Sequence, residues 1–326
     1  MDKADKQQQE QQQEQAEQRR DETDAKLFTS KLFGSDKNEN RQDASVERQE
    51  SDKLETVEIN EEKGTFLDVQ VTDRDEYPSN NMKRGVCIIL ENDMFHTDLG
   101  LSKRKGSSVD RQVMADTFTK LQFEVRIYSN LSVKEITNTL EKTAGEDHTD
   151  RDLFAVVVLS HGNEGILYGY DHSYPAHKIW EPFTADRSLS LAGKPKLFFI
   201  QACQGSKMDS GVEVKMNRTM TDSLATYRTP LYADFLLAHS TVAGFYSWRN
   251  TVSGSWFIQA LGKVVMANYM SEDLVTMLTK VSQVVARDYE SNSSRPEHNN
   301  KKQIPFIYST LVNKIFLKPK SSSPLL

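Results

Sequence analysis

The stretch LFAVVVL, at residues 153–159, is apolar at every position and is about as long as an average strand. Strands that are apolar on both faces are typical of parallel sheets that helices cover on each side. Residues 85–90 (GVCIIL) and 197–200 (LFFI) share this character, and residues 123–128 and 235–238 are two further candidate strands. We therefore expect an α/β fold with a parallel-rich sheet.

Helical patterns lie between and after these strands. Residues 109–121 carry apolar side chains at helical spacing, and the pattern of residues 255–269 is typical of an amphipathic helix. Ser132 and Glu135 have the spacing of a capping box, which satisfies two backbone N–H groups at the start of a helix. Helices at these places would supply the long crossovers that parallel strands require.

Residues 1–80 differ in composition from the rest of the chain. The chain has 326 residues, with 41 Lys and Arg against 47 Asp and Glu, and only 37% of it is hydrophobic. Residues 1–80 carry 22 acidic and 12 basic side chains, whereas residues 81–326 carry 25 acidic and 29 basic ones. A Gln/Glu run at residues 7–18 and sparse apolar side chains predict a disordered leader. We divide this leader into an acidic, Gln-rich propeptide, residues 1–24, and a flexible polar segment, residues 25–80.

Composition also excludes several classes of protein. The formal net charge is −6, and no cluster of basic residues is interleaved with aromatic ones, which argues against nucleic-acid binding. No apolar segment is long enough for a signal peptide or a membrane span. The two cysteines, Cys87 and Cys203, are too few for a disulfide framework. We expect a cytoplasmic protein without membrane association.

Two short segments that directly follow apolar strands carry reactive side chains. They are SHG, at residues 160–162, and QACQG, at residues 201–205. Reactive groups of parallel sheets lie in the loops past the carboxyl ends of the strands. A cysteine nucleophile needs a base or acid nearby, because the thiolate attacks and the leaving amine must receive a proton. Cys203 is the candidate nucleophile, and His161 is the candidate base and acid. The backbone amides of Gly162 and Cys203 are candidates for an oxyanion hole.

Together these segments resemble the caspase family of cysteine endopeptidases. The family signature is a cysteine within a QACQG-like segment and a histidine upstream, here 42 residues before it. The stretches that match, in order, are residues 102–106 (SKRKG), 159–162 (LSHG), 192–205 (AGKPKLFFIQACQG), 233–236 (ADFL), 246–250 (YSWRN) and 301–305 (KKQIP). The resemblance covers about residues 81–318, and it is greatest to executioner caspases with a short leader, such as those of insects.

The resemblance implies a three-layer sandwich, in which a central, mostly parallel six-stranded sheet has helices on both faces. It also implies a thiol protease that cleaves proteins after aspartate and acts as an executioner of apoptosis. Cys203 matches the nucleophile of the family, and His161 matches the residue that protonates the leaving amine. No metal or organic cofactor is required, and the other histidines show no metal-ligand spacing.

The resemblance also assigns residues to the pocket for the substrate aspartate. Arg104 and Arg249 match the two arginines of that pocket, and Gln201 matches its third contact. A buried carboxylate needs such cationic, preferably bidentate, partners to offset its desolvation.

More distal parts of the substrate would meet the YSWRN segment and the residues after it. Tyr246, Ser247 and Trp248 match the wall that receives the apolar side chain two residues before the cut. Trp256 lies where the family narrows its distal pocket, and Asn250 could contact an acidic residue four before the cut. The loop at residues 291–300 departs from the pattern, because it lacks the phenylalanines of vertebrate executioner enzymes, so the distal preference stays open.

Aspartates in two polar segments are candidate sites of zymogen activation, by the enzyme itself or by an upstream initiator caspase. Residues 206–229 form a long linker, and loops of that length inside a compact domain are functional or cleavable. Cleavage after Asp222 would separate a large subunit, residues 81–222, from a small subunit, residues 223–326, and Asp209 is the weaker candidate. In the leader, the sequence DETD places a further candidate at Asp24.

Two expected protein contacts follow from these segments and from the resemblance. Cleavage after Asp24 would expose Ala25, and an amino-terminal alanine resembles the tetrapeptides that inhibitor-of-apoptosis proteins bind. The resemblance implies a dimer of large-plus-small units that forms through an edge strand, here residues 306–316.

Other classes of protein remain as alternatives. An initiator caspase would carry a folded helical recruitment module, and the leader lacks apolar residues at helical spacing. A catalytically inactive caspase-like scaffold would lack part of the site, whereas Cys203, His161, Gln201, Arg104 and Arg249 are all present. A doubly wound nucleotide-binding protein would need a glycine-rich phosphate loop after a strand, and the sequence has none.

Overall fold

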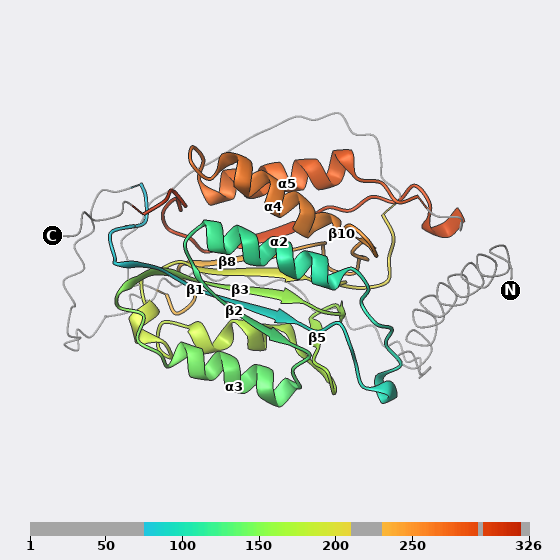
Figure 1. Cartoon of the computed structure of the whole chain (residues 1–326), viewed down its shortest axis with the longest axis horizontal. Coiled ribbons are helices and arrows are strands. Elements are labelled where there is room, and N and C mark those ends of the chain that lie inside the picture. Colours follow the sequence, from blue (N-terminus) through green and yellow to red (C-terminus); the bar gives the residue numbers. More distant parts are fainter. Residues whose placement is uncertain (1–74, 210–229, 293–295, 321–326) are drawn as a thin grey trace, which may run out of the picture.

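The computed structural model describes residues 75–209, 230–292 and 296–320, and it confirms the expected α/β fold (Figure 1). A central sheet of six strands has the order β11-β8-β7-β3-β1-β2. Neighbouring strands are parallel except at one edge, where β11 pairs antiparallel with β8. The six strands are β1 (Lys83–Glu91), β2 (Glu124–Ser129), β3 (Arg151–Leu159), β7 (Lys196–Gln201), β8 (Phe235–His239) and β11 (Phe306–Ser309).

The central strands are buried on both faces, as their apolar sequences predict. Every residue of β3 and of β7 is buried. In the pairing of these two strands, Leu159 lies opposite Gln201. Just beyond this pair, the Ser160 N–H donates to the Gln201 carbonyl oxygen at 3.2 Å. The loops that carry His161 and Cys203 therefore leave the sheet side by side at the carboxyl ends of the strands.

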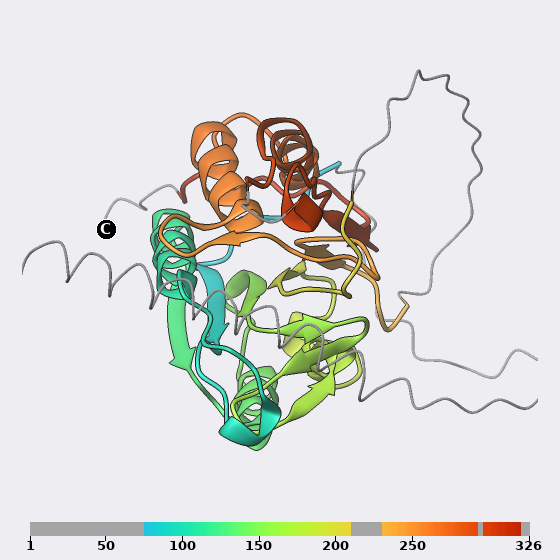
Figure 2. The same ribbon diagram turned by 90° about the vertical axis from the view of Figure 1, so that its right-hand side faces the viewer.

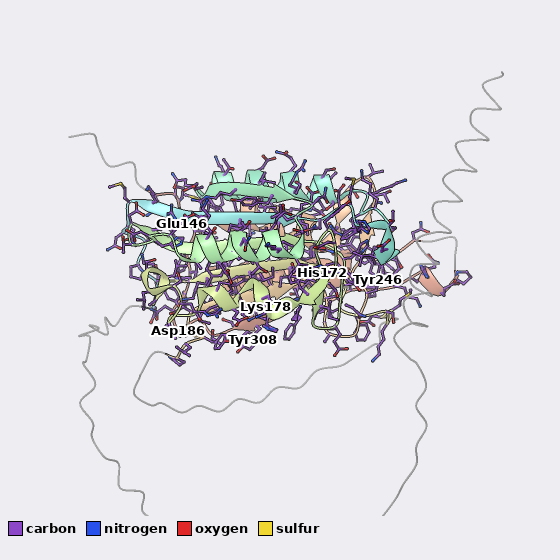
Figure 3. All side chains as sticks on the ribbon, turned by 90° about the horizontal axis from the view of Figure 1, so that it is seen from below. Glu146, His172, Lys178, Asp186, Tyr246 and Tyr308 are labelled. Carbon is purple, nitrogen blue, oxygen red and sulfur yellow. The ribbon has the colours of Figure 1, made fainter. Side chains whose placement is uncertain are left out.

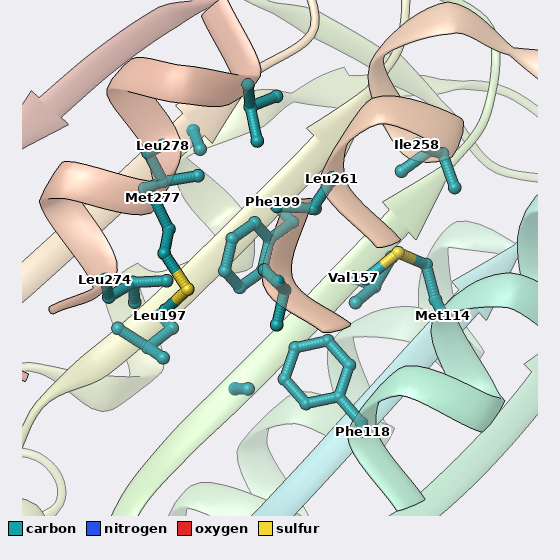
Figure 4. Packing of buried hydrophobic residues seen from close by; sticks show 14 of the residues in the cluster. Met114, Phe118, Val157, Leu197, Phe199, Ile258, Leu261, Leu274, Met277 and Leu278 are labelled. Carbon is teal, nitrogen blue, oxygen red and sulfur yellow. The ribbon is translucent and has the colours of Figure 1, made fainter. Parts of the chain in front are cut away.

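Three helices cover one face of the sheet (Figure 1). They are α2 (Ser107–Lys120), α4 (Trp256–Asn268) and α5 (Leu274–Asp288). Phe118 of α2 and Leu261 of α4 surround Phe199 of β7 in the core beneath them (Figure 4). Burial of one such large side chain contributes about 1.5–3 kcal/mol, so this core fixes both helices against the strands.

The other face of the sheet carries α3 (Val133–Ala144) and short 3-10 turns (Figure 1). Ser132 and Glu135 form the predicted capping box. A small antiparallel sheet, β4 (Gly162–Asn163), β5 (Ile166–Tyr168) and β6 (Ser173–Pro175), directly follows His161. No helix in the described part of the chain is long and apolar enough to cross a membrane.

The structure differs from the sequence expectations in two elements. Helix α5 was not predicted, although Asp273 caps it and its buried residues, among them Met277 and Val281, recur at helical spacing. The edge strand expected within residues 306–316 is only Phe306–Ser309 long. Its pairing ends at Thr310, whose N–H donates to the Phe235 carbonyl and whose hydroxyl accepts from the Phe235 N–H.

Residues 75–77 lie against the C-terminal part of the chain, although the sequence analysis placed them in a flexible leader. The Tyr77 N–H donates to the Lys314 carbonyl at 2.9 Å, and the Tyr77 hydroxyl donates to Asp234 Oδ1 at 2.7 Å. Burial and the hydrogen bond to Asp234 raise the pKa of Tyr77. The ring of Tyr77 packs on apolar surface, and its hydroxyl reaches a hydrogen-bond acceptor. The composition of the leader does not reveal that this residue is ordered.

Candidate active site

The His161 loop and the Cys203 loop pack against each other at the carboxyl ends of β3 and β7, the end seen in Figure 2. A Cβ atom placed on Gly162 would lie 2.8 Å from the Cys203 carbonyl oxygen and 2.9 Å from the Ala202 side chain. A glycine is therefore required at position 162, because any side chain would push the two loops apart.

His161 is oriented by a backbone carbonyl and by an aromatic ring. Its Nε2 lies 2.9 Å from the Ser102 carbonyl oxygen. A carbonyl only accepts hydrogen bonds, so Nε2 carries the hydrogen of the neutral ring and Nδ1 is the basic nitrogen. The Phe95 ring packs at 4.9 Å between centroids. Burial, and then the positive charges of Arg104 and Arg249, lower the pKa of His161 to about 3, so the imidazole is neutral at pH 7.

Cys203 is half-buried, and its Sγ donates to the Ser247 carbonyl oxygen at 3.8 Å. Only the protonated thiol can make this hydrogen bond. Burial raises the pKa of Cys203, while Arg249 and Arg104 act in the opposite direction. Before substrate binds, the site therefore holds a thiol and a neutral imidazole rather than an ion pair.

Arg104 is a buried cation whose hydrogen-bonding capacity is only partly used. Its side chain is almost fully buried, and Nη1 donates to the Ser107 hydroxyl at 2.7 Å. Among the described residues, no acceptor contacts Arg104 Nε or Nη2. Burial and the nearby Arg249 lower the pKa of Arg104 to about 9, and Asp110 acts against them. Two buried donors without partners are costly, so they indicate a site that an anionic ligand would complete.

Two further residues of the expected pocket lie at the same place. Arg249 Nε donates to the Lys105 carbonyl oxygen at 2.8 Å, and its charge lowers the pKa of Arg104. Gln201 is buried and bonded to the Ser247 hydroxyl at 2.8 Å, while the other end of its amide has no partner among the described residues. The structure therefore brings together Arg104, Arg249 and Gln201 beside the Cys203 loop.

Aromatic side chains form a stack next to this pocket. Trp248 stacks on Trp256 with ring centroids 5.7 Å apart, and Trp256 stacks in turn on Tyr289 at 5.5 Å. Tyr246 meets the edge of Trp248 at 5.1 Å. Tyr246 is labelled in Figure 3, at the same end of the molecule as the His161 and Cys203 loops. Trp256 is 9% exposed, so it belongs to the core and to this stack at once.

Asn250 lies at the outer rim of this region. Its Oδ1 accepts from the backbone N–H groups of Val252 and Ser253, at 2.8 and 2.9 Å. The carboxamide oxygen is thus used within its own turn, which leaves the amide nitrogen as the group that could meet an acidic substrate residue.

Residues 204–209, which follow Cys203, are hydrogen-bonded to other parts of the fold. Gln204 N–H donates to the Phe245 carbonyl at 3.0 Å, and a Cβ on Gly205 would lie 2.4 Å from the backbone of Gly244. Further on, the Lys302 N–H donates to the Asp209 carbonyl at 3.0 Å. The other two candidate cleavage sites, Asp24 and Asp222, and the alanine at position 25 lie outside the described residues.

Sequence reasoning missed several contributors to this site. The Ser102 carbonyl leaves no signal, because every residue has a carbonyl group. Tyr289, from the unpredicted α5 region, extends the aromatic stack. His298, in the loop that departs from the family pattern, meets the edge of Trp248 at 6.2 Å.

A cavity of about 320 Å³ lies elsewhere, between α3 and the segment around β6, and none of the residues above line it. Its lining includes His172 and Lys178, which Figure 3 labels on the α3 side of the sheet.

Comparison with known proteins places the chain in a family. The family model described as "Caspase domain" matches residues 84–316. Caspase drICE of Drosophila melanogaster is 43% identical over 78% of this chain and 76% of its own length. Caspase-3 of Bos taurus is 39% identical over 77% of this chain and 90% of its own. The crystal structure of caspase-1 from Spodoptera frugiperda, 40% identical, matches with a TM-score of 0.72 over 77% of this chain and 96% of that one.

The chain belongs to the caspase family. It is a cysteine endopeptidase that cleaves after aspartate, of the executioner type that acts in apoptosis and is made as a zymogen. The expectation of an insect-type executioner caspase is confirmed by the insect relatives and by the solved insect structure.

Proposed function

We propose that Cys203 is the nucleophile of this protease and that His161 moves the proton. The close packing of the two loops at Gly162 carries this assignment, together with the hydrogen bond that leaves His161 Nδ1 as the base. Because both groups are neutral before substrate binds, the proton leaves Cys203 Sγ for His161 as the sulfur attacks the carbonyl carbon.

The steps after the attack follow from the same geometry. The N–H groups of Gly162 and Cys203 stabilise the oxyanion of the tetrahedral intermediate. The protonated His161 then donates to the leaving amine, and a thioester forms on Cys203. Water hydrolyses this thioester with the neutral imidazole as general base.

The substrate aspartate binds in the pocket of Arg104, Arg249 and Gln201. Its carboxylate accepts from Arg104 Nε and Nη2, the two donors that have no partner among the described residues. Half a turn of the Gln201 amide would let the Ser247 hydroxyl donate to the amide oxygen and would turn the NH₂ group toward the carboxylate.

The aromatic stack receives the side chains that precede the aspartate in the substrate. Tyr246, Ser247 and Trp248 line the position two residues before the cut, and Trp256 closes the distal pocket. The amide nitrogen of Asn250 contacts an acidic residue four before the cut.

Processing produces a large subunit, residues 81–222, and a small subunit, residues 223–326, and cleavage after Asp24 removes residues 1–24. The structure favours Asp222 over Asp209 as the linker site. The Asp209 carbonyl, which belongs to the bond that would be cut, is hydrogen-bonded to Lys302 N–H, and the residue is half-buried. A protease would first have to break this pairing.

Contacts with other proteins extend the proposal. An upstream initiator caspase makes the first cut, and two processed units pair through β11, where Phe306 and Tyr308 are about half exposed (Tyr308 is labelled in Figure 3). The protein acts in the cytoplasm. The new N-terminus at Ala25 binds an inhibitor-of-apoptosis protein, and unchanged binding of an Ala25→Gly protein would remove this contact.

The test compares purified wild-type protein with Cys203→Ala on matched fluorogenic peptides, Asp-Glu-Val-Asp and Asp-Glu-Val-Asn. We expect turnover of the aspartate peptide alone by the wild type, and none by Cys203→Ala, which lacks the sulfur. In these purified samples no initiator is present, so only the enzyme itself can cut, and mass spectrometry should find chains that begin at Ala25 and at residue 223 in the wild type but not in Cys203→Ala.

Folded, processed wild-type protein that cuts neither peptide would overturn the assignment. The alternative of a catalytically inactive scaffold would then be favoured. No observation on the described residues supports the other alternative, an initiator-like enzyme.

A further inference from the structure

Gln303 is a buried glutamine whose side chain links two segments of the active site. It is 2% exposed. Its Oε1 accepts from the Trp248 N–H at 2.7 Å, and its Nε2 donates to the Ser240 carbonyl oxygen at 2.6 Å. One partner is a donor and the other an acceptor, so only one orientation of the amide satisfies both.

The Trp248 N–H belongs to the same peptide unit as the Ser247 carbonyl. In a planar trans peptide these two groups point in opposite directions. The Ser247 carbonyl accepts from Cys203 Sγ at 3.8 Å. Because Gln303 holds the N–H on one side of this unit, the carbonyl on the other side faces the sulfur.

The second partner of Gln303 belongs to the strand end next to the nucleophile. Ser240 directly follows β8, and its N–H donates to the Ile200 carbonyl at 2.9 Å. Its hydroxyl donates to the Ala202 carbonyl at 3.0 Å, one residue before Cys203. Gln303 therefore ties the 247–248 peptide to the same strand end that holds the nucleophile loop.

We propose that Gln303 is a positioning residue of this protease, which sets the Ser247–Trp248 peptide so that its carbonyl faces Cys203 and keeps this peptide in register with the nucleophile loop. The inference rests on the proposed role of Cys203. It does not depend on contact between Gln303 and substrate, since the amide of Gln303 is occupied by Trp248 and Ser240.

A second feature of the structure predicts which kinetic constant Gln303 controls. The Trp248 ring is held separately, by stacking on Trp256 at 5.7 Å. The aromatic wall should therefore stay in place when the amide of Gln303 is lost. Loss of Gln303 should lower kcat, which depends on the placement of the sulfur, and should change KM little.

The experiment uses three variants of the full chain. Gln303→Met keeps the size and burial of the side chain and removes both hydrogen bonds. Gln303→Glu restores both when its carboxyl is protonated, because its C=O can accept from Trp248 and its O–H can donate to Ser240. Gln112→Met is the control, since it removes an exposed glutamine of α2 that bonds only to Asp116 among the described residues.

For Gln303→Met we expect kcat on the aspartate peptide to fall about tenfold or more, with KM within about threefold of the wild type. Gln112→Met should match the wild type in both constants. Thermal melting of each variant ensures that activity is compared on folded protein.

The Gln303→Glu variant adds a readout that loss of packing cannot imitate. The ratio of its kcat to that of the wild type should rise as pH falls through the pKa of the introduced carboxyl, which burial raises toward neutrality. The ammonium of the neighbouring Lys302 is directed to the Tyr289 carbonyl and to Glu290, at 2.8 and 3.8 Å. The corresponding ratio for Gln303→Met should not vary with pH.

A Gln303→Met protein with kcat within threefold of the wild type would overturn the inference, as would a Gln303→Glu ratio that is flat between pH 5.5 and 8. If Gln303→Met does not fold, the ratio for Gln303→Glu decides alone. Failure of the wild type to cut the aspartate peptide would instead overturn the proposed function, so the two failures are distinguishable.

Discussion

The pocket of Arg104 and the aromatic stack of Trp256 lie side by side but differ in how their groups are satisfied. Arg104 is buried with two donors that have no partner among the described residues. Trp256 is already stacked on Trp248 and Tyr289. The first region holds a buried positive charge that an anion would complete. The second region is neutral and its rings are already stacked, although Trp248 Nε1 is also a buried donor without a partner among the described residues. The Arg104 pocket should therefore reject substrates without aspartate at the cut site almost completely. The aromatic stack should only favour some substrate side chains over others.

The largest expected effect comes from removal of the buried charge. In Arg104→Met, kcat/KM on Asp-Glu-Val-Asp should fall about 150- to 5,000-fold, because breaking a buried charge pair costs about 3–5 kcal/mol and each 1.36 kcal/mol is a factor of ten. The preference for aspartate over asparagine should fall with it. Steady-state kinetics on the two matched peptides measure both effects.

Arg187→Met is a suitable control for Arg104→Met, because Arg187 is an exposed arginine that pairs with Glu181 at 3.5 Å, remote from the site. An Arg104→Met protein that kept the full preference for aspartate would contradict the contrast between the two regions, because recognition of aspartate would then not depend on the unpartnered donors of Arg104.

A smaller effect is expected in the aromatic stack. Trp256→Ala removes two ring contacts, each of about 0.5–1.5 kcal/mol, and should raise KM for Asp-Glu-Val-Asp about tenfold. Trp256→Phe keeps a ring and should stay closer to the wild type. A shorter peptide that ends in Val-Asp does not reach the distal pocket and should be affected little by either change.

An equal loss on the short and the long peptide would contradict the graded role of the stack. Trp256 would then act through the packing of α4, in which it is also buried.

The smallest expected effect is a change in the pKa of His161, which distinguishes the charged pocket from the neutral aromatic stack. The positive charge of Arg104 is one cause of the low pKa of His161, after burial. Removal of this charge in Arg104→Met favours the protonated imidazole, so the pKa of His161 should rise and stay below the ordinary value of about 6.5. NMR titration of labelled histidine, assigned with His161→Gln, measures the shift.

Trp256→Phe changes no charge and should leave the pKa of His161 where it is in the wild type. If Arg104→Met also left it unchanged, the charge of Arg104 would not reach the imidazole, and burial and Arg249 would account for the low pKa of His161.

The strands and most helices were predictable because each is encoded by residues that are adjacent in sequence. The apolar run at residues 153–159 lies within β3, and the Ser132 and Glu135 capping box begins α3 as expected. Helix α5 was missed although the same signals are present around Asp273. For the edge strand, the sequence shows apolar residues up to Phe316, but the hydrogen bonds of Thr310 end the pairing earlier.

For the site, the sequence by itself determined which side chains carry chemistry. Cys203, His161 and Arg104 have reactive or charged groups in recognisable segments, and strand register then placed two of them side by side. Only the tertiary structure decided how these groups are held. The Ser102 carbonyl orients His161, and the Ser247 carbonyl faces Cys203. These are backbone atoms that every residue possesses, and they come to the site from distant parts of the chain. The amino-acid type at these positions therefore does not predict the contacts.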